Sequence, residues 1–211
     1  RVSHLQQAAI SPALQDEMYE RLEALIDDID LLVFSDFNYG CLPQPLVDRA
    51  VQLARSRNVM LVADSQSSSQ IGDIGRFRDM DLLTPTELEA RISTRNHQDG
   101  LVVLAEQLRQ SACARNILLK LGEEGLLVHP ASVAAGGALT DRLGALNSAP
   151  SDVAGAGDSL LIASALTLAS GGNIWEAAYL GSLAAAVQVG RVGNTPIRIE
   201  ELVELLEEFR G

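Results

Sequence analysis

Cysteine and histidine are scarce in this sequence, with 2 and 3 copies among 211 residues. The two cysteines, Cys41 and Cys113, form no CxxC pair, and no paired histidines accompany them. The cysteine pattern therefore implies neither a disulfide framework nor a structural zinc site. So little cysteine suits a reducing compartment, and we expect a cytoplasmic protein.

Positive charge and long apolar runs are also in short supply. The sequence has 16 Lys and Arg against 28 Asp and Glu, a net charge of −12. This excess of carboxylates repels phosphate backbones and anionic lipid, so we expect no nucleic acid or membrane partner. The longest apolar run, 160–169, is interrupted by Ser164 and Thr167. It is shorter than the ~20 residues that a membrane-spanning helix needs.

The chain nevertheless has enough apolar side chain to bury a core, because 47% of its residues are hydrophobic. Its length fits one domain, and we expect residues 1–211 to form a single one.

Strand-like and helix-like stretches alternate along the chain. Short apolar runs bounded by turn residues predict buried strands at 31–34, 59–63, 117–120 and 126–129, the last two forming a hairpin around 121–125. Apolar residues at three- and four-residue intervals predict helices at 12–29, 46–54, 86–92, 101–112, 156–170, 174–189 and 199–209. This alternation predicts an α/β fold with three αβα layers and a mostly parallel, Rossmann-like sheet.

Polar residues follow two predicted strands at Ser35-Asp36 and Asp64-Ser65, and Thr84-Pro85 likewise follows the apolar pair Leu82-Leu83. The carboxyl ends of parallel strands lie at one edge of a sheet, where such folds bind ligands. The three clusters should therefore converge on one side.

The segment from Asp152 to Ser159, directly before a long apolar helix, carries the most chemistry. The small residues Gly155, Ala156 and Gly157 leave their backbone amides uncovered. Together with the positive end of the helix dipole, these amides predict a pocket for anionic oxygens. Asp158, on the first helical turn, stays ionised and can accept a proton from a substrate hydroxyl.

An anion pocket beside a carboxylate suits phosphoryl transfer, which requires mainly positioning and electrostatic stabilisation. The competing interpretation is a tight turn with Asp158 as a helix cap. A Walker loop is excluded because Gly-Lys-Ser/Thr is absent, and Leu160 breaks the dinucleotide pattern. The letters Gly157 to Leu160 also spell the GDSL esterase signature, but no histidine follows Ser159 to act as its base.

Asp152 to Asp158 resembles the C-terminal signature D-T-x-G-A-G-D of the PfkB-type, or ribokinase-like, carbohydrate kinases, except at Val153. The resemblance extends over nearly the whole chain. It implies a ribokinase-like fold, ATP and Mg²⁺ as cofactors, and Asp158 as the catalytic base. It also implies that the amides of Gly155, Ala156 and Gly157 form the anion hole.

Other segments are similar to the family's nucleotide and metal motifs. Residues 120–125 resemble its strand–turn–strand element beside the nucleotide, which implies roles for Lys120, Gly122 and Gly125. Residues 84–89 resemble P-N-x-x-E, in which Glu89 helps to organise magnesium. Similarity also implies that Ser182 lies near the adenine, and that Asp152 contacts nucleotide or a monovalent cation.

Within the family, residues 35–40, 63–65 and 190–193 resemble the kinase half of the ADP-heptose synthases, which phosphorylate a heptose 7-phosphate. Tyr39 and Gln66 stand near the places where those enzymes carry lysines. The resemblance implies a sugar or sugar-phosphate substrate contacted by Asp36, Asn38 and Asp64. Loop capping is the competing interpretation for the two aspartates.

The expected function is therefore an ATP-dependent carbohydrate kinase that phosphorylates a sugar hydroxyl. By comparison with the family, the chain is expected to be a C-terminal portion without the N-terminal strands and lid. The alternative is a non-catalytic nucleotide-binding module with a regulatory or assembly role. A homodimer is among the expected assemblies.

Overall fold

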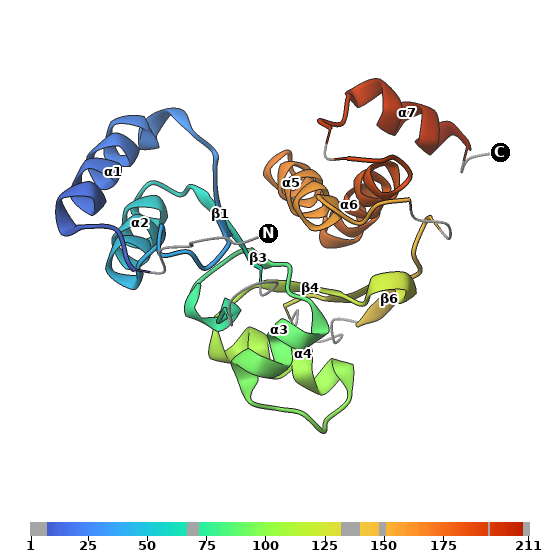
Figure 1. The fold of residues 1–211 in the computed structure, drawn as a ribbon, viewed down its shortest axis with the longest axis horizontal. Coiled ribbons are helices and arrows are strands. Elements are labelled where there is room, and N and C mark those ends of the chain that lie inside the picture. The colour runs from blue at the N-terminus through green and yellow to red at the C-terminus, as the bar shows by residue number, and fades with distance from the viewer. Residues whose placement is uncertain (1–7, 67–71, 132–139, 148–150, 194, 209–211) are drawn as a thin grey trace, which may run out of the picture.

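A six-stranded sheet in the order β1-β2-β3-β4-β5-β6 runs through the protein in this computed structural model (Figure 1). The structure describes residues 8–66, 72–131, 140–147, 151–193 and 195–208. The strands are β1 Leu31–Asp36, β2 Met60–Ser65, β3 Leu82–Leu83, β4 Asn116–Lys120, β5 Leu126–His129 and β6 Asp141–Leu143. Strands β1 to β4 are parallel, whereas β5 and β6 join antiparallel. The predicted mostly parallel sheet and its hairpin are confirmed.

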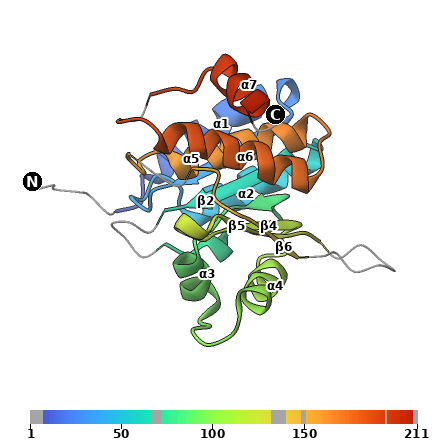
Figure 2. The ribbon, with the colours of Figure 1, turned by 90° about the vertical axis from the view of Figure 1, so that its right-hand side faces the viewer.

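Helices cover both faces of the sheet, which confirms the predicted α/β class (Figure 2). The α-helices are α1 Pro12–Leu25, α2 Gln44–Ser56, α3 Glu87–Thr94, α4 Leu101–Ser111, α5 Ala156–Ala169, α6 Ile174–Val189 and α7 Ile199–Glu208. Short 3-10 turns occur at η1 Ile26–Asp28, η2 Ile74–Arg76 and η3 Gly122–Glu124. Within the described ranges, none of these helices has the length and apolar character needed to cross a bilayer.

Alternation along the strands divides the core into two layers. Leu61 and Leu119 pack with residues of α2, α3 and α4 on one face. Val62 and Leu118 pack with α5 and α6 on the other. Since neighbouring strand residues point to opposite faces, every polar residue that follows a strand is committed to one of these layers.

The first helix differs from its predicted extent. The apolar repeat predicts a helix to residue 29, but α1 ends at Leu25 and η1 continues the chain. No residue of α1 is buried, and Leu14, Met18 and Leu25 are exposed. The reason is that α1 packs against α2 rather than against the sheet. Of the residues of α1, Tyr19 and Leu22 pack against the core.

Strand β6 was not predicted, because Asp141-Arg142-Leu143 contains no apolar run. The strand pairs antiparallel with Leu126 to Val128 of β5, which its own sequence does not reveal. The strand therefore forms by backbone pairing at the edge of the sheet rather than by burial of its own side chains.

Candidate active site

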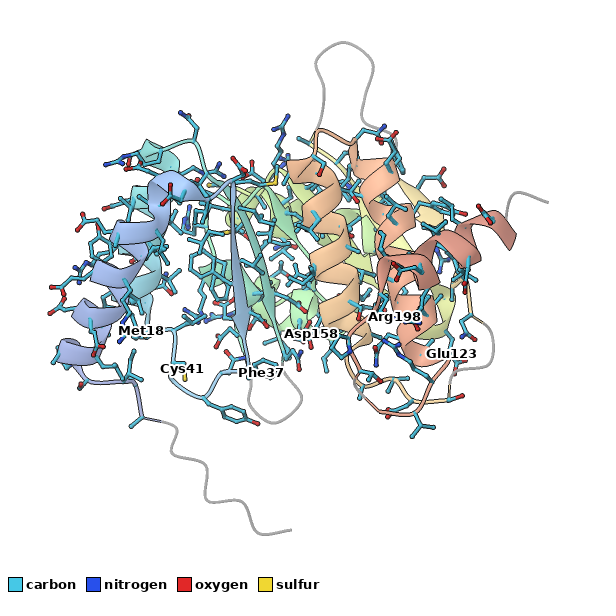
Figure 3. The ribbon with its side chains drawn as sticks, turned by 90° about the horizontal axis from the view of Figure 1, so that it is seen from above. Met18, Phe37, Cys41, Glu123, Asp158 and Arg198 are labelled. Carbon is cyan, nitrogen blue, oxygen red and sulfur yellow. The ribbon has the colours of Figure 1, made fainter. Side chains whose placement is uncertain are left out.

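The polar strand ends meet at one edge of the sheet, as predicted, but they divide between its two faces. Ser35 pairs with Asp64 and Asp36 with Ser65 in the parallel register of β1 and β2. Asp64 shares the face of Val62, under α5, whereas Asp36 shares the face of Phe34 in the opposite layer. Figure 3 shows Asp158 at the same end of the molecule as Phe37 and Cys41 of the loop after β1.

Helix α5 begins at this edge with a glycine in a left-handed conformation. Gly155 is the N-cap residue with φ 79°, a value that L-residues with a side chain rarely adopt. The amide of Ala156 donates to Val153 O at 3.3 Å. No partner of the Gly155 or Gly157 amide is found within the described parts of the chain. Two of the three predicted anion-hole amides therefore keep their hydrogen-bonding capacity at the positive end of the helix.

Asp158 lies on the first turn of α5 and is half-buried. Its Oδ1 accepts a hydrogen bond from Gln66 Nε2 at 3.3 Å. Gln66 follows β2, so a residue at a strand end orients the carboxylate at the helix start. Asp158 forms no ion pair with another residue in the described ranges.

Asp64 and Lys120 form a buried ion pair beside this turn. Lys120 Nζ lies 2.8 Å from Asp64 Oδ2 and 3.1 Å from Oδ1. The Asp64 side chain is 1% exposed and that of Lys120 is 15% exposed. Burial raises the pKa of the Asp64 carboxyl, and the negative charges of Glu89 and Asp158 raise it further, while Lys120 lowers it.

The ion pair lies against Gly157. A Cβ on Gly157 would lie 3.3 Å from Lys120 Nζ and 3.8 Å from Asp64 Oδ2. Glycine thus permits the ammonium to approach the first turn of α5. Sequence reasoning placed Lys120 with the nucleotide and Asp64 with the sugar, and missed their pairing. The signal was available, since Asp64 follows Val62, and Lys120 follows Leu118, at the two-residue spacing of one strand face.

A hollow of about 380 Å³ opens on the other side of Lys120, between the start of α3 and the turn after β4. Its lining residues are Thr86, Glu87, Leu88, Arg91, Lys120, Leu121 and Gly122. Gly122 has φ 62°, and a Cβ on it would meet nothing within 4 Å, so its backbone is accessible. Gly125 differs, because a Cβ there would lie 2.1 Å from Leu143 O. The structure thus gives the two predicted nucleotide glycines different surroundings.

Glu89 begins α3 as part of a capping box. Its Oε2 accepts from Thr86 N at 2.7 Å, and Thr86 Oγ1 accepts from Glu89 N at 3.2 Å. The side chain is 6% exposed. The residue predicted to organise magnesium therefore also stabilises the start of α3. Its negative charge raises the pKa of the Asp64 carboxyl.

Asp36 and Asn38 order the loop after β1. Asp36, 4% exposed, accepts from Arg76 Nη2 at 2.6 Å and from Asn38 N at 3.0 Å. Asn38 Nδ2 donates to Ser65 Oγ at 3.2 Å and to Gln66 O at 2.6 Å. Both residues predicted to contact the sugar thus fix the segment whose Gln66 side chain orients Asp158.

Asp152 ties the turn before α5 to the loop after α6. Its Oδ1 accepts from Ala154 N at 3.0 Å and its Oδ2 accepts from Gly193 N at 3.2 Å. These backbone hydrogen bonds, with Ala154 first, lower the pKa of the Asp152 carboxyl. The fully buried Gln188 donates to Ala154 O and Gly193 O, both at 3.0 Å. The predicted adenine neighbour Ser182 is buried on α6, outside this network.

The described histidines do not serve Ser159. His129 lies on the sheet face opposite α5, with Nδ1 2.7 Å from Thr140 Oγ1 and Nε2 2.8 Å from Glu106 Oε2. His97 lies in the segment that joins α3 to α4, two helices on the sheet face opposite α5 (Figure 2). The site in the described residues therefore lacks the base that the esterase alternative requires.

The sequence profile described as pfkB family carbohydrate kinase matches residues 4–200. The chain belongs to the pfkB family. The match includes the Asp152–Ser159 segment, β2 and the turn after β4, so it spans every element of the site.

Curated relatives include the bifunctional protein HldE. The chain is 32% identical over 196 residues to HldE of Shewanella sp. (strain W3-18-1), covering 92% of this chain and 39% of that protein. It is 27% identical over 206 residues to HldE of Citrifermentans bemidjiense, covering 96% of this chain and 40% of that protein. The chain thus spans well under half the length of these relatives. The predicted likeness to the ADP-heptose synthase kinase half is confirmed.

Solved structures of the same fold include phosphofructokinase-2 from Escherichia coli in complex with potassium. The TM-score is 0.75 at 16% identity, covering 96% of this chain and 64% of that one. For the ribokinase of Arabidopsis thaliana complexed with ribose and ATP, the TM-score is 0.70 at 16% identity, covering 94% and 60%. These neighbours confirm the ribokinase-like fold.

Proposed function

We propose that this protein is an ATP-dependent carbohydrate kinase that transfers the γ-phosphoryl group to a sugar hydroxyl. The observation that carries the proposal is the start of α5. There the Asp158 carboxylate stands beside the Gly155 and Gly157 amides, which lack partners in the described chain. A proton acceptor and an anion-binding helix start are the two groups that phosphoryl transfer to an alcohol requires.

The proposed reaction assigns one task to each group. The sugar hydroxyl oxygen forms a bond to the γ-phosphorus while the bond to the β,γ-bridging oxygen breaks, and ADP leaves. Asp158 Oδ accepts the hydroxyl proton as the new bond forms. The Gly155 and Gly157 amides and the helix dipole stabilise charge on the phosphoryl oxygens. Gln66 keeps the carboxylate oriented through its 3.3 Å hydrogen bond.

The carboxylates around this edge fit a magnesium ion that arrives with the nucleotide. No group of three metal-ligating side chains converges anywhere in the described ranges. Magnesium needs no such cage, because it usually keeps several waters and uses one or two carboxylates with substrate phosphates. Glu89 would hold the ion through water, at the same edge as Asp158. When bound, the ion would neutralise the phosphate charge.

The acceptor is a sugar or a sugar phosphate. The relatives named above are HldE proteins, and the likeness of their kinase half supports a heptose-type acceptor for this chain. Gln66 contacts Asp158 by a hydrogen bond, and Asn38 of the loop 35–40 donates to Gln66 O. This loop and the Gln66 segment are the proposed acceptor side.

A second candidate is a nucleotide-binding module without transfer activity. It is favoured by one observation on the acceptor side. Asp36 and Asp64, both predicted to contact the sugar, are 4% and 1% exposed, and they are paired with Arg76 and Lys120. A module of this kind would bind Mg·ATP and leave every sugar unchanged.

The two candidates are separated by ADP release from Mg·ATP across a panel of sugars and sugar phosphates. The kinase proposal predicts release with at least one acceptor and a large loss in Asp158→Asn. Glu200→Gln is the matched control, because Glu200 is an exposed acid in the first turn of α7. Mg·ATP that raises Tm without any acceptor-dependent release would favour the binding module instead.

A further inference from the structure

The sequence contains a single lysine, Lys120, while its other 15 positively charged residues are arginines. That lysine is partly buried beside the proposed catalytic turn and is paired with the buried Asp64. A buried ion pair adds little stability compared with well-packed apolar residues. An ammonium is also a compact charge that can exchange partners, unlike a forked guanidinium. Lys120 can therefore have a role besides holding Asp64.

Lys120 stands between the two open parts of the site. Its Nζ is 3.3 Å from the position of a Cβ on Gly157, whose amide has no described partner. Lys120 is also one of the residues that line the 380 Å³ hollow, together with the accessible Gly122. A phosphate chain that runs from this hollow to the start of α5 must therefore pass the ammonium.

The groups around Asp64 bear on whether Lys120 can leave it and bind a phosphate instead. Glu89 and Asp158 are near enough for their negative charges to act on Asp64, and Lys120 is the cation that opposes them there. Thr84 follows Leu83, the partner of Ala63, so it neighbours Asp64 on the same sheet face. Its buried Oγ1 has no hydrogen-bond partner among the described residues. This unused donor therefore lies on the same sheet face as Asp64.

We propose that Lys120 binds the transferring phosphoryl group, and that Asp64 is a positioning residue that holds the ammonium under the first turn of α5 until that group arrives. The inference rests on the proposed kinase function and adds two roles to it. Lys120 becomes a catalytic residue at the γ-phosphoryl group rather than a part of the nucleotide turn. Asp64 acts through Lys120 rather than on the sugar.

A single lysine permits a direct test by NMR. Protein labelled with ¹³C only in lysine gives one Cε signal, which reports on Lys120 Nζ. We expect a non-hydrolysable Mg·ATP analogue to shift this signal, and AMP, which lacks the β- and γ-phosphates, to leave it unchanged at saturation. In Asp64→Asn the signal of the nucleotide-free protein should already differ. Saturating analogue that leaves the signal in place would overturn the proposal.

Kinetics test the same role independently. Lys120→Met should lower kcat by roughly 10²- to 10³-fold, the range for losing one preorganised donor to the transition state. The KM for the acceptor should change little, and Lys120→Arg should recover part of kcat. Lys120→Met leaves a buried carboxylate without its partner, so its Tm is expected to fall.

The double variant Asp64→Asn/Lys120→Met separates chemistry from stability. It removes both charges, so Tm should recover relative to Lys120→Met while kcat stays low. Recovery of kcat together with Tm would show a purely structural pair and would overturn the proposal. Failure of the kinase function is distinguishable: wild-type protein would then release no ADP with any acceptor, whether or not the analogue shifts the lysine signal.

Discussion

Replacing Gly157 by alanine should separate activity from stability, because the two respond in opposite directions. Gly157 lies in the first turn of α5 without a positive φ, so alanine fits its backbone. Exchanging glycine for alanine within a helix favours the helix by up to ~1 kcal/mol. The added methyl group, however, would lie 3.3 Å from Lys120 Nζ. Since that neighbour is the end of a flexible side chain, it can move by a few tenths of an ångström without large strain.

The expected result is therefore an unchanged or higher Tm with a much lower turnover. For a chain of this size, 1 kcal/mol corresponds to a Tm change of roughly 2–4 °C. Turnover should fall roughly 10²-fold or more, because the methyl group occupies the approach to the Gly157 amide and displaces the ammonium. Thermal unfolding and ADP release measure the two quantities on one preparation.

Gly144→Ala is the matched control, since a Cβ on Gly144 meets nothing within 4 Å and its φ is not positive. It should retain wild-type turnover. Wild-type turnover in Gly157→Ala would refute the placement of a phosphoryl group at this turn.

Two further predictions concern stability. Gly125→Ala should lower Tm strongly, because φ 89° and ψ −127° strain any side chain by about 1–3 kcal/mol and because its Cβ would lie 2.1 Å from Leu143 O. Gly122→Ala, at φ 62° in open space, should cost less, and the reverse order in thermal unfolding would contradict this packing. Glu106→Gln should reduce the loss of folding free energy that occurs as the pH is lowered into the acid range. Arg109, followed by His129, lowers the pKa of Glu106 from 4.5 to about 2, so wild-type stability present above pH 4.5 is lost as the pH falls toward 2. An equally steep loss in both proteins during acid unfolding would exclude this role.

The fold and the start of the site could be predicted because they depend on local pattern. Apolar runs indicated the parallel strands, and Gly155 to Asp158 marked the start of α5 beside the sheet edge. The structure gives that turn a left-handed glycine and an accessible carboxylate. Family membership followed from the same residues.

Side-chain partners were less predictable, because they depend on contacts between distant segments. Lys120 and Asp64 lie 56 positions apart in the sequence and meet only because both point to the α5 side of the sheet. Asp36 points to the other side of the sheet, where it forms an ion pair with Arg76 of η2. The alternation along a strand gives the face on which each aspartate lies, but it does not name Lys120 or Arg76 as the partner.

Some expectations stay predictions. These are the single domain over 1–211, the cytoplasmic location, the homodimer, and the monovalent cation beside Asp152. In the structure that carboxylate is already bound by the amides of Ala154 and Gly193.

The most direct test of the central assignment is the single-turnover rate of γ-phosphoryl transfer in wild-type protein and Asp158→Asn, with Mg·ATP and the acceptor identified by the panel. The substituted amide would keep the shape of the side chain and the hydrogen bond to Gln66 but could not accept a proton. We predict that the phosphorylated sugar forms roughly 10²- to 10⁴-fold more slowly, while the Kd for Mg·ATP stays near the wild-type value. Equal rates of sugar phosphorylation in the two proteins would contradict the role of Asp158.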